Sequence, residues 1–150
     1  MERVLSKVAP YLYTLMRIVV GLLFACHGAQ KLFGLFGGFG GQPGMAAALF
    51  SLMGLAGIIE FVGGLFIAVG LFTRYVAFLA SGEMAFAYFM SHYPQGFWPI
   101  ENKGELPVLY CFVFLYMAAR GSGPWCLETV LRARRAATTP HPPGMSVPTS

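Results

Sequence analysis

Four apolar segments follow one another along the chain, each close to the length of a membrane-spanning helix. They cover about residues 11–33, 45–72, 75–93 and 103–120. A bilayer core about 30 Å thick takes roughly 20 helical residues to cross. Few polar side chains interrupt these segments, and the second is the most apolar of the four. The pattern predicts an all-α integral membrane protein folded as a four-helix bundle.

The fourth segment is the shortest, because its continuous apolar part begins only at Leu106. We expect residues 103–105 to begin this helix and to bring it closer to spanning length. Asn102 is a suitable N-cap, since its side chain can accept a hydrogen bond from a free amide of the first turn. Pro107 is tolerated in that turn, where its missing N–H has no helical partner.

The stretches between and beyond the predicted spans have the composition of loops and tails. Residues 34–44 hold six glycines and one proline, which disfavour a helix, and two residues separate the second span from the third. Residues 1–10 are expected to form a short N-terminal segment. Residues 129–150 begin as a basic segment and continue as a Pro-, Thr- and Ser-rich tail, which we expect to be disordered.

Composition supports a membrane protein. Hydrophobic residues make up 57% of the chain and charged residues only 11%, which leaves too little polar surface for a soluble domain of 150 residues. The formal net charge of +4 favours contact with anionic lipid headgroups, because the basic residues lie at the ends of the spans. No motif indicates binding to nucleic acid.

The distribution of Lys and Arg predicts the orientation. With four spans, both termini and the turn between the second and third spans lie on one side of the membrane. That side carries Arg3, Lys7, Arg74, Arg120, Arg132, Arg134 and Arg135, and the other side carries Lys31 and Lys103. Basic residues accumulate on the cytoplasmic side. Both termini are therefore expected to be cytoplasmic.

The polar residues of the first span fall on one face of a helix. At about 100° per residue, this face carries Arg17, Gly21, Phe24, His27, Gly28 and Lys31. A polar stripe that contains two glycines is expected to face other helices rather than lipid.

Each of the next two spans carries one glutamate between small residues. Glu60 has a glycine three residues before it and another four residues after it, and Glu83 has alanines at the same spacings. Both acids are therefore expected inside the bundle. A charge near the bilayer centre costs about 3 kcal/mol even on the lenient insertion scale, and Arg17 is the fixed cation of the inner half. We predict a buried charge network in which Arg17 pairs with Glu60 or Glu83.

A second polar group is predicted at the outer ends of the spans, formed by His27, Lys31, His92 and Glu105. An imidazole and an ammonium one turn apart suit a small polar headgroup, and we interpret this group as a candidate polar site for a quinone or a small oxyanion. His92 lies nine residues after Glu83, on the opposite side of an ideal helix, so the two share a face only if the helix is distorted. No catalytic residue and no metal site are predicted.

Four ordered sequence blocks resemble the DoxX family of membrane proteins. The blocks are "GLLFACHGAQKLFG", "GIIEFVGGLFIAVGLFTR", "GEMAFAYFMSHYPQGFWP" and "NKGELPVLYCFVFLYMAARGSGPWCLE". They place a DoxX-like four-span domain at about residues 11–128. The motif positions are Arg17, His27, Gly28, Lys31, Gly34, Glu60, Gly64, Thr73, Arg74, His92, Gly96, Phe97, Gly104 and Glu105.

The resemblance implies a multi-pass protein of the bacterial inner membrane. Members of the family are linked to respiratory redox chemistry, as a small subunit of a thiosulfate:quinone oxidoreductase, or to oxidative-stress defence beside a sulfurtransferase and a superoxide dismutase. A soluble oxidoreductase or sulfurtransferase is accordingly the expected partner, and quinone is the cofactor to be considered.

Two functional classes stay open. In the first, the protein is a redox accessory subunit whose polar interior binds or protonates a quinone. In the second, it is a membrane scaffold or small-solute transporter, and the same charges fix the helix register or line a path. No flavin, haem or nucleotide motif is present, so an enzyme acting alone is not expected. Oligomerisation is left open. Cys26 and Cys111 are interpreted as small packing residues, and a redox role of Cys26, Cys111 and Cys126 is also left open.

Overall fold

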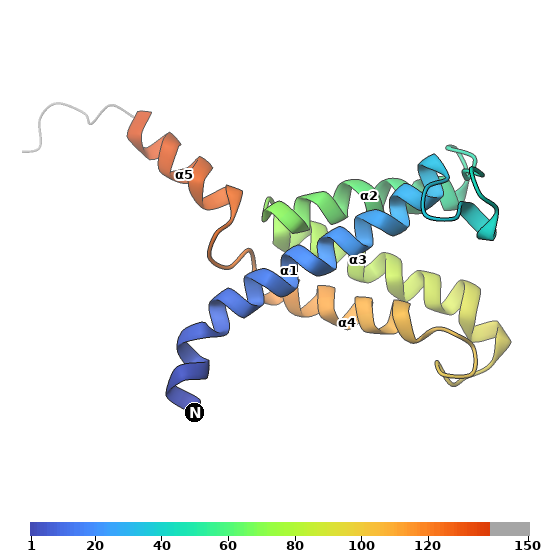
Figure 1. The fold of residues 1–150 in the computed structure, drawn as a ribbon, viewed down its shortest axis with the longest axis horizontal. Helices are drawn as coiled ribbons and strands as arrows, with labels where there is room; N and C mark the ends of the chain where they lie inside the picture. Colours follow the sequence, from blue (N-terminus) through green and yellow to red (C-terminus); the bar gives the residue numbers. More distant parts are fainter. Residues whose placement is uncertain (139–150) are drawn as a thin grey trace, which may run out of the picture.

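The computed structural model describes residues 1–138 and contains helices and no strands in that range. The all-α prediction is confirmed. Figure 1 shows the α-helices α1 (Glu2–Phe33), α2 (Leu52–Val69), α3 (Thr73–Ala87), α4 (Glu105–Arg120) and α5 (Leu127–Thr138). A π turn, Tyr88–His92, continues α3, and short 3₁₀ turns lie at Phe39–Gly41 and Tyr93–Gln95. The predicted disordered tail lies outside the described residues from residue 139 onward.

The first two helices differ from the predicted spans at their N-terminal ends. Helix α1 begins at Glu2, so the predicted N-terminal segment is helical and Pro10 lies within the helix. Helix α2 begins at Leu52, seven residues later than the apolar run. The hydroxyl of Ser51 accepts a hydrogen bond from the amide of Gly54 (3.1 Å) and caps the helix there. Hydropathy alone does not distinguish an apolar loop from the helix that follows it.

The predicted N-cap of α4 is wrong. The helix begins at Glu105, with Gly104 as its N-cap, and Pro107 lies in its first turn as expected. The side-chain Oδ1 of Asn102 instead accepts a hydrogen bond from the amide of Gly104 (2.8 Å), and its Nδ2 donates to the carbonyl of Gly96 (2.7 Å). Asn102 is therefore committed to closing the loop that precedes the helix.

Helices α1 and α2 are antiparallel and pack through backbone contacts at glycines. A Cβ added to Gly21 would lie 2.7 Å from the carbonyl oxygen of Gly64, and a Cβ added to Gly28 would lie 2.7 Å from that of Gly57. No real side chain tolerates such distances. The glycine face predicted for α1 is thus the face that contacts α2, as expected for small residues in closely packed membrane helices.

Helices α3 and α4 form the second antiparallel pair. Ser81 donates a hydrogen bond to the carbonyl of Cys111 (2.8 Å) near the middle of this pair. Aromatic rings join it to α1: the ring of Phe24 lies 4.7 Å from that of Phe114 and 5.6 Å from that of Tyr110, between ring centroids. All three are buried, so this cluster forms the core between α1 and α4.

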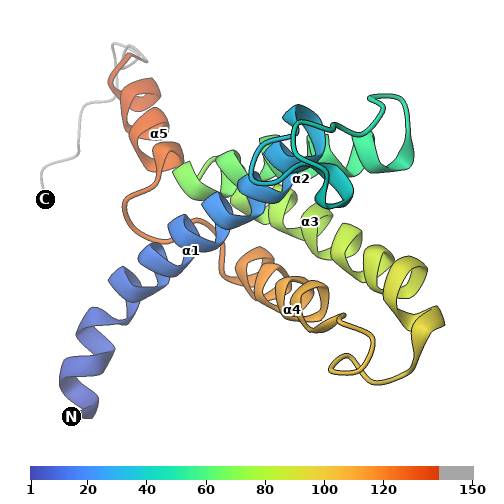
Figure 2. The same cartoon turned by 45° about the vertical axis from the view of Figure 1, so that its right-hand side comes forward.

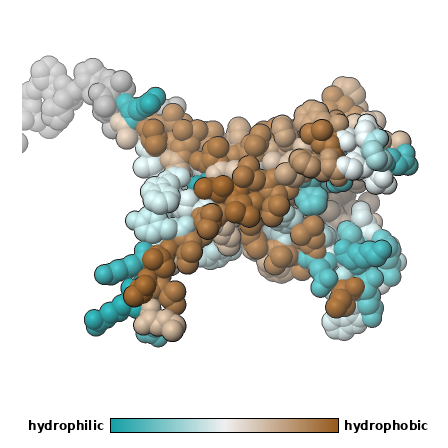
Figure 3. All heavy atoms as spheres, in the orientation of Figure 1, coloured by the Kyte–Doolittle hydropathy of each residue, from teal (hydrophilic) through white to brown (hydrophobic). Residues whose placement is uncertain are grey.

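The outer surface of the helices is strongly apolar. Figure 3 shows a hydrophobic band across the middle of the molecule, with hydrophilic residues toward the two ends. Helices α1 and α2 are each long and apolar enough to cross a membrane. In Figure 2 the N-terminal part of α1 and helix α5 extend from one end, whereas the α1–α2 and α3–α4 connections lie at the other. Below, we call these the basic end and the loop end.

Candidate functional site

A small cavity of about 180 Å³ lies among the helices toward the loop end. Polar side chains from different elements reach it: His27 and Lys31 from α1, Glu60 from α2 and His92 from the π turn. Its remaining walls are Phe24, Met84, Ala87, Leu106, Pro107 and Tyr110. Three of the four residues predicted for the outer polar group therefore meet here. Glu105 does not, because it is exposed in the first turn of α4 and does not line the cavity.

Lys31 and Glu60 form an ion pair within this cavity. The ammonium of Lys31 donates a hydrogen bond to Oε1 of Glu60, whose side chain is only 2% exposed. The close approach of α1 and α2 at Gly28 and Gly57 brings the two side chains together. The second carboxylate oxygen of Glu60 is buried and has no hydrogen-bond partner among the described residues. This oxygen is thus left for a ligand or a proton.

The predicted pairing of Arg17 with a glutamate is wrong. Arg17 is fully buried, but its Nη1 donates to the carbonyls of Ile67 (2.5 Å) and Ala68 (2.8 Å), and its Nη2 donates to the carbonyl of Trp125 (3.2 Å). These carbonyls include the last turn of α2, where the helix dipole favours a cation. Gly70 has φ +74° and leaves room for the guanidinium: a Cβ there would lie 2.8 Å from Nη1 of Arg17.

The two histidines are held by different contacts. His27 is half-buried, and its ring meets the ring of Tyr110 edge to face at 6.2 Å between centroids. The Nδ1 of His92 lies 2.9 Å from the carbonyl oxygen of Asn102, within hydrogen-bonding distance. This bond fixes the imidazole of His92 and leaves Nε2 as the nitrogen available to the cavity.

A larger groove of about 780 Å³ runs between α2 and α3 and meets the cavity. Lys31, Ala87 and His92 line both hollows. Most of the groove wall is apolar and comes from Leu52, Met53, Leu55, Ala56, Ile59, Phe78, Leu79, Phe86 and Met90. The groove therefore joins a long apolar surface to a polar end.

The π turn brings Glu83 and His92 into the same groove. Both side chains line it, although an ideal helix would place them on opposite sides. The wider turn at Tyr88–His92 rotates the end of the helix relative to α3. Oε2 of Glu83 is buried and has no hydrogen-bond partner among residues 1–138. The helix distortion that the sequence required for Glu83 and His92 to share a face is therefore present.

Sequence reasoning missed two residues that shape the site. Tyr110 forms a wall of the cavity and contacts His27, but it lies in an apolar run that gives no functional signal. Asn102 holds His92 and the preceding loop, and the sequence indicated it only as a helix cap. Both roles depend on contacts between residues distant in sequence.

The residues that the structure describes form neither a metal site nor a dithiol site. Across residues 1–138 there is no group of three His, Cys, Asp or Glu side chains arranged to hold a metal ion. All three cysteine thiols are free: Cys26 is exposed, Cys111 is half-buried and Cys126 is buried. Cys26 lies on α1, Cys111 on α4 and Cys126 in the segment before α5, and no two of them form a disulfide.

Comparison with known proteins gives a family match. The DoxX family profile matches residues 12–93, a range that contains His27, Lys31, Glu60, Glu83 and His92. An uncharacterized protein of Haemophilus influenzae is 41% identical over 127 residues, which cover 83% of this chain and 93% of that protein. No solved structure matches the chain.

Proposed function

The chain belongs to the DoxX family, and from this premise we propose that it is a four-span protein of the bacterial inner membrane that binds a quinone and serves a redox partner as an accessory subunit. The partner is a soluble oxidoreductase or sulfurtransferase. The headgroup site consists of His27, Lys31 and His92, together with Glu60 and Glu83. The apolar groove between α2 and α3 receives the tail.

Helix lengths support four spans. Helices α1 and α2 are long enough by themselves. The continuous helical segment from residue 73 to residue 92 is roughly 30 Å long at about 1.5 Å per residue, and α4 has 16 residues, or about 24 Å. Basic residues gather at the end that holds both the N-terminus and α5. That distribution favours both termini in the cytoplasm and the loop end outside.

The observation that carries the proposal is the junction of the two hollows. A quinone has a polar head with carbonyl oxygens and, in membranes, a long apolar tail. The cavity offers an ammonium and two imidazoles, and the groove offers an apolar wall that opens along the helices. Lys31 and His92 lie where the two hollows meet, at the position where head and tail would join.

The side chains of the site have the chemistry that a quinone headgroup requires. When a partner supplies electrons, reduction to the quinol also takes up protons on the two oxygens. Lys31 can stabilise negative charge on one oxygen, and His27 and His92 can donate a hydrogen bond or a proton. The buried Oε2 atoms of Glu60 and Glu83 have no partner among the described residues and can hold the protons that follow.

The scaffold or transporter reading is supported by a different observation. The Lys31–Glu60 pair joins α1 to α2 and would fix their register without any ligand. This reading explains the pair, but it gives no reason for an apolar groove that ends at three titratable side chains. We therefore place it second.

Photoaffinity labelling tests the quinone site. The full chain, in detergent or nanodiscs, is exposed to a quinone with a photoreactive azido group in its tail, and labelled peptides are identified by mass spectrometry. We expect labels around the groove on α2, on α3 and on the π turn, at residues such as Met53 and Met90. Unlabelled ubiquinone should compete with the label.

A matched pair of tryptophan variants makes the test specific. Leu55 and Val62 are both exposed on α2, but only Leu55 lines the groove. Leu55→Trp should therefore block labelling, and Val62→Trp should not. Labelling that spreads evenly over the lipid-facing helices, or that Leu55→Trp leaves unchanged, would exclude the quinone site. The scaffold or transporter reading would then replace it.

A further inference from the structure

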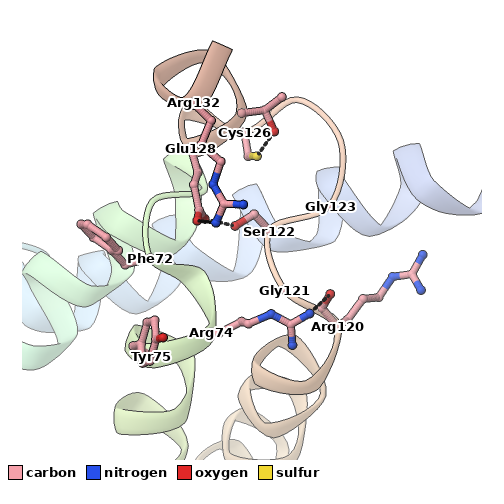
Figure 4. A pocket seen from close by; sticks show the side chains of 11 residues that line it. Phe72, Arg74, Tyr75, Arg120, Gly121, Ser122, Gly123, Cys126, Glu128 and Arg132 are labelled. Carbon is pink, nitrogen blue, oxygen red and sulfur yellow. Dashed lines mark hydrogen bonds and ion pairs between the residues drawn. The ribbon is translucent and has the colours of Figure 1, made fainter. Parts of the chain in front are cut away.

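A separate cavity of about 290 Å³ lies at the basic end, far from the proposed quinone site. It is formed where the α2–α3 turn, the end of α4 and the start of α5 meet (Figure 4). Its wall consists of Phe72, Arg74, Tyr75, Arg120, Gly121, Ser122, Gly123, Cys126, Glu128, Thr129 and Arg132. Cationic and hydroxyl side chains dominate this wall, whereas the groove between α2 and α3 is apolar.

Two guanidinium groups face the cavity from opposite sides. In Figure 4, Arg132 extends down from α5 toward Ser122, and Arg74 lies on the opposite side below it. Arg74 is anchored by hydrogen bonds from Nη1 to the carbonyls of Ala118 (3.2 Å) and Ala119 (2.6 Å) and from Nη2 to that of Arg120 (3.3 Å). These bonds fix its position and leave the Nε–H and one Nη2–H for a ligand.

The other charged side chains of the wall act differently. Arg120 points away from the cavity in Figure 4, because its guanidinium lies over the ring of Tyr13, 5.0 Å from the centroid. Glu128 accepts hydrogen bonds from Arg132 (2.5 Å) and from the hydroxyl of Ser122 (3.0 Å). Its carboxylate holds Arg132 across the mouth of the cavity and offsets one positive charge. Arg74 and Arg132 outnumber it, so the cavity stays cationic.

The rim of the cavity is apolar and exposed. The side chain of Phe72 is 54% exposed and that of Tyr75 is 78% exposed. Leu127, Val130 and Leu131 add exposed apolar groups on the first turns of α5, before its arginines. A helix with this mixture of basic and apolar residues is suited to the interface between headgroups and acyl chains. A free anion in water would need only the charges, whereas a lipid also uses the apolar rim.

We propose that this cavity binds the phosphate of an anionic phospholipid headgroup from the cytoplasmic leaflet, between Arg74 and Arg132. The proposal rests on the orientation proposed above, which places the basic end in the cytoplasm. The phosphate receives N–H groups from both arginines and a hydroxyl from Thr129 or Tyr75. The acyl chains lie against Phe72 and Tyr75. Binding at this point would anchor the start of α5 to the membrane surface.

The chain offers a fluorescence test, because its two tryptophans, Trp98 and Trp125, lie at opposite ends of the molecule. Cys126 is part of the cavity wall, and Trp125 precedes it in the chain. The side chain of Trp125 is exposed. Full-length Trp98→Phe protein is reconstituted in phosphatidylcholine vesicles that contain brominated phosphatidylglycerol or the same amount of brominated phosphatidylcholine. Bromine quenches tryptophan on contact. We expect stronger quenching of Trp125 by the brominated phosphatidylglycerol.

Charge-matched variants locate the binding site. Arg132→Gln should lose the excess quenching, whereas Arg134→Gln, which removes the same charge from the same helix outside the cavity wall, should keep it. Trp98, measured alone in a Trp125→Phe protein, should show no excess. Equal quenching by the two brominated lipids, or equal loss in both arginine variants, would overturn the proposal in favour of diffuse attraction to the membrane.

Inorganic phosphate distinguishes a lipid from a soluble anion. If phosphate raises the thermal stability of the wild type but not of Arg132→Gln, and no lipid preference is seen, the cavity takes a free anion and the lipid assignment is wrong. The variants leave the proposed quinone site untouched. Loss of quinone labelling with intact lipid preference, or the reverse, therefore shows which of the two proposals fails.

Discussion

Lys31 donates a hydrogen bond from its ammonium to the buried carboxylate of Glu60, and this bond joins α1 to α2 where their backbones are in contact. The pair thus belongs both to the packing of the helices and to the wall of the candidate site. A change at either residue is expected to affect stability as well as ligand binding.

The Lys31–Glu60 pair should show strong energetic coupling. Removing either partner alone, as in Lys31→Met or Glu60→Gln, should cost about 3 to 5 kcal/mol if the other group stays charged and buried. The double variant should cost less than the sum by about 1 to 3 kcal/mol. Thermal and denaturant unfolding in one detergent measures the coupling. Additive losses would show that the two groups do not interact.

The backbone contact between α1 and α2 should not accept a methyl group. Gly28→Ala should destabilise the protein by at least about 1 kcal/mol, because the added Cβ would collide with the backbone of Gly57 and Phe61. Gly82→Ala is the matched control, since a Cβ there has no atom within 4 Å. It should be neutral, or stabilising by up to about 1 kcal/mol as expected for a glycine in a helix. Equal effects of the two changes on melting temperature would disprove the contact.

Arg17 should stabilise the end of α2 rather than pair with a glutamate. Arg17→Leu should be strongly destabilising, because three backbone carbonyls lose their donor. Arg17→Lys should recover only part of the loss, since an ammonium cannot reproduce the guanidinium geometry. The effects of Arg17→Lys and Glu60→Gln on unfolding should be additive. Coupling above about 0.5 kcal/mol would instead support the ion pair between Arg17 and Glu60 that the sequence predicted.

The junction between α4 and α5 should loosen in acid. Hydrogen bonds from Ser122 and Arg132 lower the pKa of Glu128 below its ordinary value of 4.5. A lowered pKa in the folded state means that the carboxylate stabilises the junction above about pH 4.5, and that this contribution is lost as the pH falls through the lower pKa. Trp125 emission in Trp98→Phe protein, followed from about pH 7 to pH 3, should report the change. Glu128→Gln should remove this step, and an identical profile in that variant would assign the transition to other groups.

The sequence alone predicted the helices and the faces on which their polar residues lie. The stripe on α1 could be predicted because helix periodicity places Arg17, Gly21 and Lys31 on one side whatever surrounds the helix. Its burial against α2 followed from the glycines, which are of little use on a lipid-facing surface. His27, Lys31 and His92 were grouped correctly because they lie toward the same end of neighbouring spans.

The tertiary structure decided which charged group meets which. Arg17, the fixed cation of the inner half, was predicted to pair with Glu60 or Glu83, but depth along a helix does not fix the rotation of one helix against another. The contact of Gly28 with Gly57 sets that rotation and brings Lys31 to Glu60, while Arg17 finds the open carbonyls at the end of α2. The π turn that brings His92 into the same groove as Glu83 is likewise a response to packing, since no residue pattern within Tyr88–His92 specifies it. Local periodicity is a property of the chain, whereas helix rotation and pairing depend on contacts between distant segments.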